Sequence, residues 1–294
     1  MKYAIYLPNW GEFADPKNYL EFASVAESAG WDGIFLWDHI LLHRHSAVPM
    51  ADAWVVLAAI AATTKRVRLG ALITPLARRR PWKVAREITS LDVLSGGRAI
   101  FGLGLGAPVG AEFECFGEDG ADRVRADKMD EAIEIVCALQ TGEPVTFEGK
   151  YFTVDDVQFR PVPIQRPRVP VWVAGFHPYR RPMRRAAKWD GIFPLQAPST
   201  GRGDASETEV EWSTMWLSPA QLRECIALVS EHRSSMSGFD VIACGATPIG
   251  DPESAKRSVA EHEAVGATWW IEWLDDQRGT LGEMLERVRQ GPPK

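Results

Sequence analysis

Short apolar segments and helical segments alternate along the whole chain, and this alternation limits the possible folds more than any single motif. Runs such as "VRLGALIT" (67–74) and "VPVWVAG" (169–175) are apolar throughout, as expected of strands buried on both faces. Each run is followed by a stretch with helical spacing of apolar residues, which is long enough to connect parallel strands. The expected strands are 3–8, 33–37, 67–74, 98–106, 169–175, 191–195, 240–245 and 267–274.

The expected helices are about 16–29, 52–63, 81–94, 123–140, 179–188, 219–235, 252–265 and 280–290. A doubly wound sheet has about five or six strands, whereas a barrel needs eight strand–helix units. The sequence therefore predicts an α/β protein with a (β/α)₈ (TIM) barrel. No linker divides the chain, so residues 1–294 are expected to form one domain.

Insertions are expected after strands four and six. Strand four is followed by "APVGAEFECFGEDGAD" and then by 146–159, which has the pattern of a hairpin turning at Glu148-Gly149-Lys150. Strand six is followed by the polar stretch 197–217, which is either a lid or a flexible surface loop. We expect the stretch after strand four, the hairpin and the stretch 197–217 to lie at the carboxyl ends of the strands, where barrel enzymes have their active sites.

Composition restricts the partners. The net charge of -6 and the lack of a basic run argue against nucleic-acid binding. No run of 18 apolar residues is present, so we expect no membrane span, and the amino terminus lacks the pattern of a signal peptide. The four cysteines are scattered without metal-ligand spacing, which is typical of a cytoplasmic protein with reduced thiols.

The stretch "GGRAIFGLGLGAP" (96–108) contains the spelling G-x-G-x-x-A, which also occurs in dinucleotide-binding turns. Such a turn must open directly into a helix, but here Pro108 follows and the next helix starts well downstream. Gly104 and Gly106 instead end the fourth strand. Small residues there allow a flat ligand to approach the backbone, or else they relieve packing at a crowded barrel end.

Four segments together carry a family resemblance: "DGIFLWDHI", "KRVRLGALITPL", "TSLDVLSGGRAIFGLGLGAP" and "VPVWVAGFHP". As a set they resemble the bacterial luciferase-like family of flavin-dependent oxidoreductases, over residues 1 to about 195. The resemblance implies a (β/α)₈ barrel that binds FMN or the deazaflavin coenzyme F420 at the carboxyl ends of its strands. It also implies a homodimer.

Asp38 and His39 follow the second strand. A histidine can transfer a proton near neutral pH, and an adjacent carboxylate can fix its tautomer or bind a ligand hydroxyl. The resemblance implies that His39 lies near the deazaflavin ring, so both residues are candidate catalytic and cofactor-binding residues. The alternative is a helix-capping Asp38 and a packed His39.

The resemblance also implies further cofactor contacts. A non-prolyl cis peptide at Ala71–Leu72 is expected to support the ring from behind. The turn after strand five is expected to meet the cofactor phosphate through Gly175, Phe176 and His177, although Phe176 stands where relatives often have a second glycine.

Three residues are expected at the substrate pocket. Trp10 follows the first strand, His43 lies in the loop after the second, and Glu272 lies among the tryptophans of the last strand. If buried, Glu272 must be paired or protonated, so an ion pair with a helix is the alternative. His43 and His45 lack a clear third ligand, and we therefore expect no metal site.

The sequence thus favours F420-dependent hydride transfer to or from a small organic substrate, with His39 as proton donor. One alternative is an FMN-dependent monooxygenase that uses O₂ and reduced flavin from a partner reductase; another is a non-catalytic flavin-binding relative. A metal-dependent hydrolase also stays open. A sugar-phosphate substrate is disfavoured, because Ala107 replaces the acidic residue of that branch and no lysine follows "DGIFPL".

Overall fold

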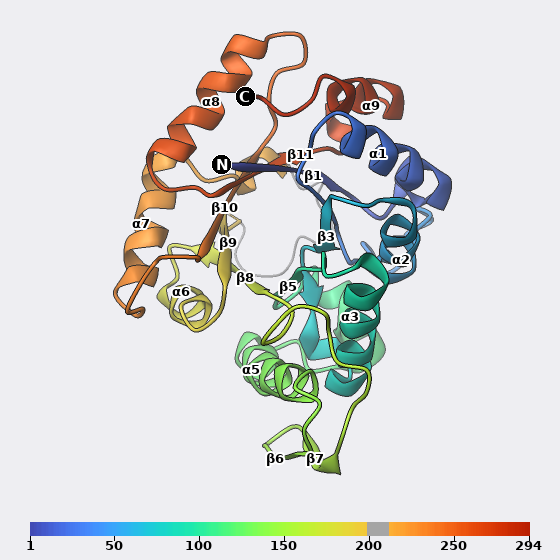
Figure 1. Cartoon of the computed structure of the whole chain (residues 1–294), viewed down its shortest axis with the longest axis vertical. Helices are drawn as coiled ribbons and strands as arrows, with labels where there is room; N and C mark the ends of the chain where they lie inside the picture. The colour runs from blue at the N-terminus through green and yellow to red at the C-terminus, as the bar shows by residue number, and fades with distance from the viewer. Residues whose placement is uncertain (199–211) are drawn as a thin grey trace.

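A computed structural model describes residues 1–198 and 212–294. Its main sheet is a ring of parallel strands in the order β3-β2-β1-β11-β10-β9-β8-β5-β4 (Figure 1). The strands are β1 (Lys2–Leu7), β2 (Gly33–Leu36), β3 (Arg68–Ala71), β4 (Thr74–Pro75), β5 (Phe101–Gly104), β8 (Val171–His177), β9 (Gly191–Gln196), β10 (Asp240–Gly245) and β11 (Trp269–Trp273).

The ring closes between β3 and β5. A parallel bridge joins Leu69 to Ala99, with the Leu69 N–H donating to Arg98 and the Ile100 N–H donating to Leu69. The predicted third strand is present as two pieces, because the chain between β3 and β4 leaves the ladder at Leu72–Ile73. Counting β3 and β4 as one position, the strands number eight in the described residues, which confirms the predicted (β/α)₈ barrel.

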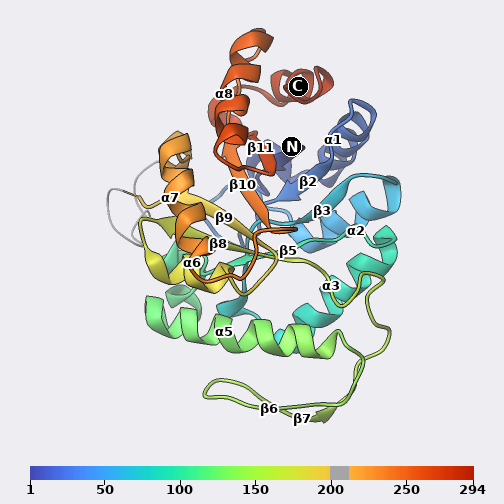
Figure 2. The same cartoon turned by 60° about the vertical axis from the view of Figure 1, so that its left-hand side comes forward.

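Helices surround the ring on the outside (Figures 1 and 2). They are α1 (Pro16–Ser28), α2 (Ala53–Thr63), α3 (Pro81–Ser95), α5 (Asp122–Leu139), α6 (Arg180–Ala186), α7 (Pro219–Ser230), α8 (Pro252–Ala264) and α9 (Leu281–Arg289). Their ends follow local chemistry: Asp52 caps α2 by accepting from the Trp54 and Val55 N–H groups, and Gly96, at φ 72°, ends α3 in the left-handed conformation. No helix in the described part of the chain is long and apolar enough to cross a membrane.

The two parts of the insertion after β5 lie in different places, one at an end of the barrel and one outside its helices. The short helix α4 (Val109–Glu112) follows β5 at the carboxyl ends of the strands, which we call the mouth. The predicted hairpin is present as β6 (Val145–Glu148) and β7 (Thr153–Val157). It follows α5 and precedes β8, and it lies along the outer side of α5 (Figure 2), where the N–H groups of Lys150 and Tyr151 donate to Glu131. The expectation that the hairpin lies at the carboxyl ends of the strands is therefore wrong. Most of the insertion after strand six falls outside the described residues.

The barrel axis is filled with aromatic side chains. In β11, Trp269, Ile271 and Trp273 point into the axis, whereas Trp270 and Glu272 alternate toward the helices. At the amino-terminal end of the strands, the indoles of Trp172 and Trp269 donate to Asp240 at 3.1 and 3.0 Å. Because the axis is packed from this end up to the mouth, a ligand must bind at the rim of the mouth rather than inside the barrel.

Candidate functional site

His39 follows β2 at the mouth, and its backbone is held by Asn9, which follows β1. The Asn9 amide donates to the His39 carbonyl at 2.7 Å and to the Ala51 carbonyl at 2.8 Å. The His39 N–H donates back to the Asn9 side-chain oxygen at 3.2 Å. Asn9 is completely buried, so this amide fixes the chain that carries His39 without contacting solvent.

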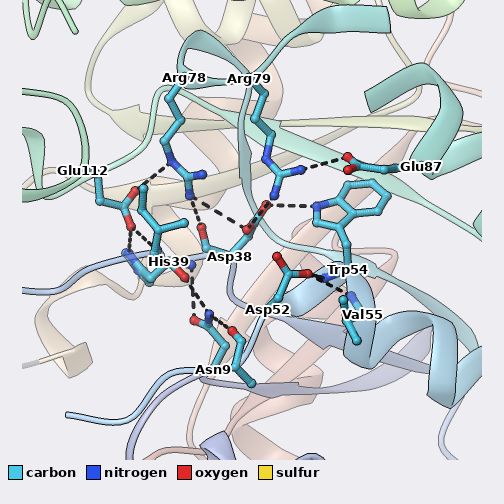
Figure 3. A network of polar contacts seen from close by, with 12 residues as sticks. Asn9, Asp38, His39, Asp52, Trp54, Val55, Arg78, Arg79, Glu87 and Glu112 are labelled. Carbon is cyan, nitrogen blue, oxygen red and sulfur yellow. Dashed lines mark hydrogen bonds and ion pairs between the residues drawn. The ribbon is translucent and has the colours of Figure 1, made fainter. Parts of the chain in front are cut away.

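The His39 ring is oriented by Glu112, the last residue of α4. Nδ1 of His39 lies 2.9 Å from the Glu112 carboxylate, which also accepts the Ile40 N–H at 2.9 Å and the Arg78 guanidinium at 3.3 Å (Figure 3). The Glu112 side chain has no exposed surface. A carboxylate on Nδ1 fixes the ring orientation and leaves Nε2 as the atom available for proton transfer.

The charges around Glu112 keep it ionised. Burial alone would raise the pKa of Glu112, but His39, Arg78 and the Ile40 N–H together lower it below its ordinary value. An ionised Glu112 requires a proton on Nδ1 of His39. The neutral ring then accepts a proton at Nε2, and the protonated ring donates one there.

Asp38 has a different position from the one expected of a catalytic residue. Its carboxylate is buried and accepts the Trp54 indole N–H at 3.1 Å and the Arg79 guanidinium at 3.2 Å. Arg79 also donates to Glu87 at 2.9 Å, which ties the end of β2 to α3 (Figure 3). These contacts turn the Asp38 carboxylate toward α2 and α3. Asp38 therefore supports the site from behind, and Glu112 orients the His39 ring, the role that we expected of Asp38.

Tryptophan rings pack beside the His39 ring. Trp10 and Trp37 lie 5.5 and 5.6 Å from it between ring centroids. Trp37 contacts Trp273 at 4.8 Å, and Trp273 contacts Trp216 at 6.3 Å. Trp10 thus lies beside His39, and its place in a substrate pocket stays a prediction. Together these tryptophans form a buried aromatic floor under the mouth.

Polar atoms without protein partners lie near this surface. Within the described residues, Nε2 of His39 makes no hydrogen bond, and neither do the buried Trp216 Nε1 and Thr74 Oγ1. Thr74 lies at the end of β4 and is completely buried. Since buried donors are normally satisfied, these atoms indicate that a polar ligand belongs at the mouth.

The cis peptide lies one bond further along than expected. The non-prolyl cis bond is Leu72–Ile73, so the prediction of Ala71–Leu72 is wrong. Leu72 points into the barrel axis, and its carbonyl accepts the Tyr6 hydroxyl, whereas Ala71 packs outward. Leu72 therefore keeps a position behind the mouth, and Ala71 does not.

The glycines in and just after β5 allow a neighbouring segment of the chain to pack closely against them. A Cβ on Gly104 would lie 2.4 Å from Ile73 Cδ1, and one on Gly106 would lie 2.7 Å from Pro75 Cβ. The segment Ile73–Pro75 thus occupies the space that the missing side chains leave. This favours the packing explanation of the glycine stretch over direct approach of a ligand.

The turn after β8 is likewise tied to protein partners. A Cβ on Gly175 would lie 2.2 Å from Pro182, so this glycine allows α6 to pack on β8. The His177 ring lies 2.8 Å from Glu224 of α7 and 3.4 Å from Gln196. The β5–β8 pairing ends at Leu103 and Val173, whereas β8 continues to His177 alongside β9, so Phe176 lies at the mouth opposite Leu195 of β9.

Of the other two residues expected at the pocket, Glu272 lies elsewhere and the role of His43 stays a prediction. Glu272 is completely buried on the outer side of β11, where it accepts from Thr247 at 2.9 Å and pairs with Arg278 at 2.7 Å and Arg287 at 3.6 Å. The alternative of an ion pair is therefore the observed one, and Glu272 does not line the mouth. His43 is exposed in the loop after β2.

We also looked at metal-binding clusters and cavities away from His39 in the described residues. No group of three or more His, Cys, Asp or Glu side chains in the described residues is arranged to hold a metal ion. Two surface cavities, of about 240 Å³ beside Arg233 and about 150 Å³ between α1 and α9, lie away from His39. The mouth therefore remains the candidate active site.

The family of the chain follows from its match to a known family profile. The profile of the luciferase-like monooxygenase family matches residues 4–207. The chain belongs to this family. The luciferase-like chain is also 37% identical over 164 residues to a protein of Beutenbergia cavernae named F420-dependent glucose-6-phosphate dehydrogenase, covering 53% of this chain and 45% of the relative. It spans about half the length of the curated relatives that it matches.

Solved structures show the same fold. An F420-dependent secondary alcohol dehydrogenase in complex with an F420–acetone adduct superposes on the luciferase-like chain with a TM-score of 0.74 at 19% identity, over 98% of both chains. A monooxygenase from Streptomyces bottropensis does so with a TM-score of 0.77 at 20% identity, over 99% of this chain and 97% of the other. At these identities the likeness shows the architecture alone.

Proposed function

We propose that this protein is an F420-dependent oxidoreductase that transfers a hydride between the deazaflavin and a small, uncharged organic substrate. The observation that carries the proposal is the His39–Glu112 pair at the mouth, with Nδ1 of His39 held at 2.9 Å and Nε2 directed to no protein partner in the described residues. The names of the relatives support F420 as the cofactor.

The residues at the mouth fit a flat tricyclic cofactor. Trp10 and Trp37 form a buried aromatic floor beside His39, and the buried Thr74 Oγ1 and Trp216 Nε1 are hydrogen-bonding groups without protein partners in the described part of the chain. When bound, F420 supplies or accepts a hydride. The aromatic rings would orient the ring system and exclude water from its face.

His39 supplies the proton chemistry that hydride transfer requires. When an alcohol is oxidised, its hydroxyl proton must leave, and neutral His39 accepts it at Nε2; when a carbonyl is reduced, protonated His39 donates it. The carboxylate of Glu112 is the group that pairs directly with the His39 ring, at 2.9 Å from Nδ1.

The substrate is inferred to lack a phosphate. Arg78 and Arg79 are already bonded to Glu112, Asp38 and Glu87, so neither guanidinium is available for an anion without breaking these pairs. The aromatic floor instead suits an apolar alcohol or carbonyl compound. This distinguishes the proposed substrate from that in the name of the relative from Beutenbergia cavernae.

The test is binding and turnover with purified protein. We expect F420 to bind and to be reduced with secondary alcohols but not with glucose 6-phosphate. His39→Gln should lower kcat by about 100-fold or more with little change in the Kd for F420. His45→Gln, in the exposed part of the same loop, is the matched control. Tight binding of FMN without binding of F420 would favour the FMN-dependent monooxygenase, and binding without turnover would favour a non-catalytic relative.

We propose further that the protein is a cytoplasmic homodimer that receives reduced coenzyme from a separate reductase. Support for the dimer comes from α2, whose outward face carries Val55, Ala58, Ala59 and Ala62 at helical spacing. Val55, in the first turn of α2, is 68% exposed, and a second copy packed on this face would cover it together with the alanines. Light scattering should give a mass of twice 32.6 kDa for the unchanged protein, and Ala59→Arg should lower the measured mass to that of a single chain.

A further inference from the structure

Asp275 is a buried carboxylate at the mouth that the proposed reaction does not use. It lies two residues beyond the end of β11, and its exposed fraction is 2%. In the parallel register Trp273 stands opposite Tyr6 of β1, so Asp275 lies level with the chain just after β1, at the carboxyl ends of the strands. The Trp273 indole donates to Oδ2 of Asp275 at 2.8 Å, and the Gln277 N–H donates to Oδ1 at 3.0 Å.

Trp273 is the central ring of the aromatic floor. Its ring centroid lies 5.0 Å from that of Tyr6 and 4.8 Å from that of Trp37, both in edge arrangements, and 6.3 Å from that of Trp216. Trp37 in turn lies 5.6 Å from the His39 ring. Because these rings are closely packed, a change in the orientation of Trp273 would change the surface beside His39.

The position of Asp275 is set by the chain around it rather than by the indole. Asp275 caps the short 3₁₀ helix η5 (Asp276–Arg278), and the Arg278 N–H donates to the Asp275 carbonyl at 3.1 Å. The Arg278 guanidinium donates to the Trp273 carbonyl at 2.7 Å and pairs with Glu272 at 2.7 Å. None of these contacts involves the indole ring, so the carboxylate is an acceptor in a preset place.

This acceptor selects one orientation of the Trp273 ring. The second side-chain torsion of tryptophan is broad and roughly two-fold, and its two orientations direct the indole N–H to opposite sides. Turning the ring over would remove the N–H from Asp275 and deprive a buried donor and a buried carboxylate oxygen of this contact. Burial raises the pKa of Asp275, and the hydrogen bonds from Trp273 and Gln277 oppose that rise, so the indole also stabilises the carboxylate.

We propose that Asp275 is a positioning residue whose carboxylate fixes the orientation of the Trp273 ring and thereby the shape of the aromatic floor beside His39. That this floor receives the ring system of F420 rests on the proposed function, but the tie between Asp275 and Trp273 does not. Because Asp275 acts on the floor and not on the His39–Glu112 pair, it should affect cofactor binding more than proton transfer.

Nuclear magnetic resonance of the full chain with isotope-labelled tryptophan tests the tie without cofactor or substrate, and Trp273→Phe identifies the Trp273 indole signal. In Asp275→Ser the hydroxyl can still cap η5 but is too short to replace the carboxylate at the indole. We expect the resonance to move and the indole proton to exchange with solvent about five- to tenfold faster, the range expected for one hydrogen bond. Asp276→Asn, at the exposed neighbour in η5, should leave the signal unchanged.

A second variant serves if Asp275→Ser does not fold. Asp275→Asn keeps the size of the side chain but has a single, uncharged oxygen. Whichever N–H this oxygen accepts, the Trp273 indole loses either its acceptor or the charge on it, so its resonance must move as well. A Trp273 signal that is the same in the folded variant as in the unchanged protein would overturn the proposal.

Cofactor binding tests the consequence for the mouth. We expect Asp275→Ser to raise the Kd for F420 about tenfold while kcat at saturating F420 changes by less than about twofold, the reverse of the pattern expected for His39→Gln. An unchanged Kd would overturn the positioning role. If the unchanged protein does not bind F420, the proposed function is contradicted, and the indole result still decides whether Asp275 fixes the Trp273 ring.

Discussion

His39 is held by residues from three separate parts of the chain. Asn9 fixes its backbone from the end of β1, Glu112 orients its ring from α4, and Arg78 bonds both the Glu112 carboxylate and the Asp38 carbonyl. Each of these contacts is buried or nearly so. A ring held in this way loses little freedom when it transfers a proton, because its orientation is already set.

Replacing Glu112 with Gln should test the orienting role. The amide keeps the shape of the side chain but removes the charge that fixes the proton on Nδ1. We expect kcat to fall by about 10- to 100-fold and the pH profile of kcat to change, with little effect on the Kd for F420. Glu114→Gln, two residues away and exposed, is the control. An unchanged pH profile in Glu112→Gln would contradict the assignment.

Glu112 should also contribute to acid stability. Its pKa is lowered in the folded chain from an ordinary value of 4.5. Because the unfolded chain takes up the proton first, the contribution is fully present above about pH 4.5 and is lost as the pH falls through the lower pKa of the folded state. Urea unfolding from pH 7 to 3 should show a shallower loss of stability for Glu112→Gln than for the unchanged protein. A slope equal to that of the unchanged protein would refute this.

At the scale of elements, the sequence predicted the strands and helices closely because each has a local cause. Apolar runs, proline at the first helical turn, and caps such as Asp52 and Gly96 are all local signals. The break in strand three at Leu72–Ile73 has no such signal, since both residues continue an apolar run. The partner of His39 was missed for a similar reason: the acidic insertion after β5 was visible, but which of its carboxylates turns inward depends on the fold of α4.

The packing of α6 on β8 gives a prediction at this scale. A Cβ on Gly175 would lie 2.2 Å from Pro182, at the start of α6, where the backbone must move to make room. Gly175→Ala should therefore lower the free energy of unfolding by about 1–3 kcal/mol. Gly110→Ala is the control, because the nearest atom to its new Cβ is 4.0 Å away. Equal urea midpoints for the two variants would rule out this role.

For the whole molecule, the closure between β3 and β5 is the thinnest part of the ring. Two backbone hydrogen bonds join the strands there, at Leu69 and Ile100. Below them the buried Arg98 guanidinium donates to the carbonyls of Ala61, Thr64, Val67 and Ser95. One side chain thus satisfies the end of α2, the end of α3 and the start of β3 together.

Arg98→Met should weaken the closure between β3 and β5. The substitution keeps the apolar stem but leaves several buried carbonyls without donors, so we expect a loss of about 3 kcal/mol or more in the free energy of unfolding, measured by urea denaturation. Arg123→Met is the control, because the Arg123 side chain is 88% exposed. A loss no greater than that of the control would show that the closure does not depend on Arg98.

The carboxylate that sets the tautomer of His39 is carried by α4, a short insertion outside the hydrogen-bonded ring of strands. Substitutions on the surface of residues 107–120 can therefore change this partner without breaking the hydrogen bonds between the strands. A relative with a different segment here would have a different residue beside the histidine on the same barrel. Exchanging this segment between homologues is therefore a direct way to change the proton chemistry of the site while the barrel stays the same.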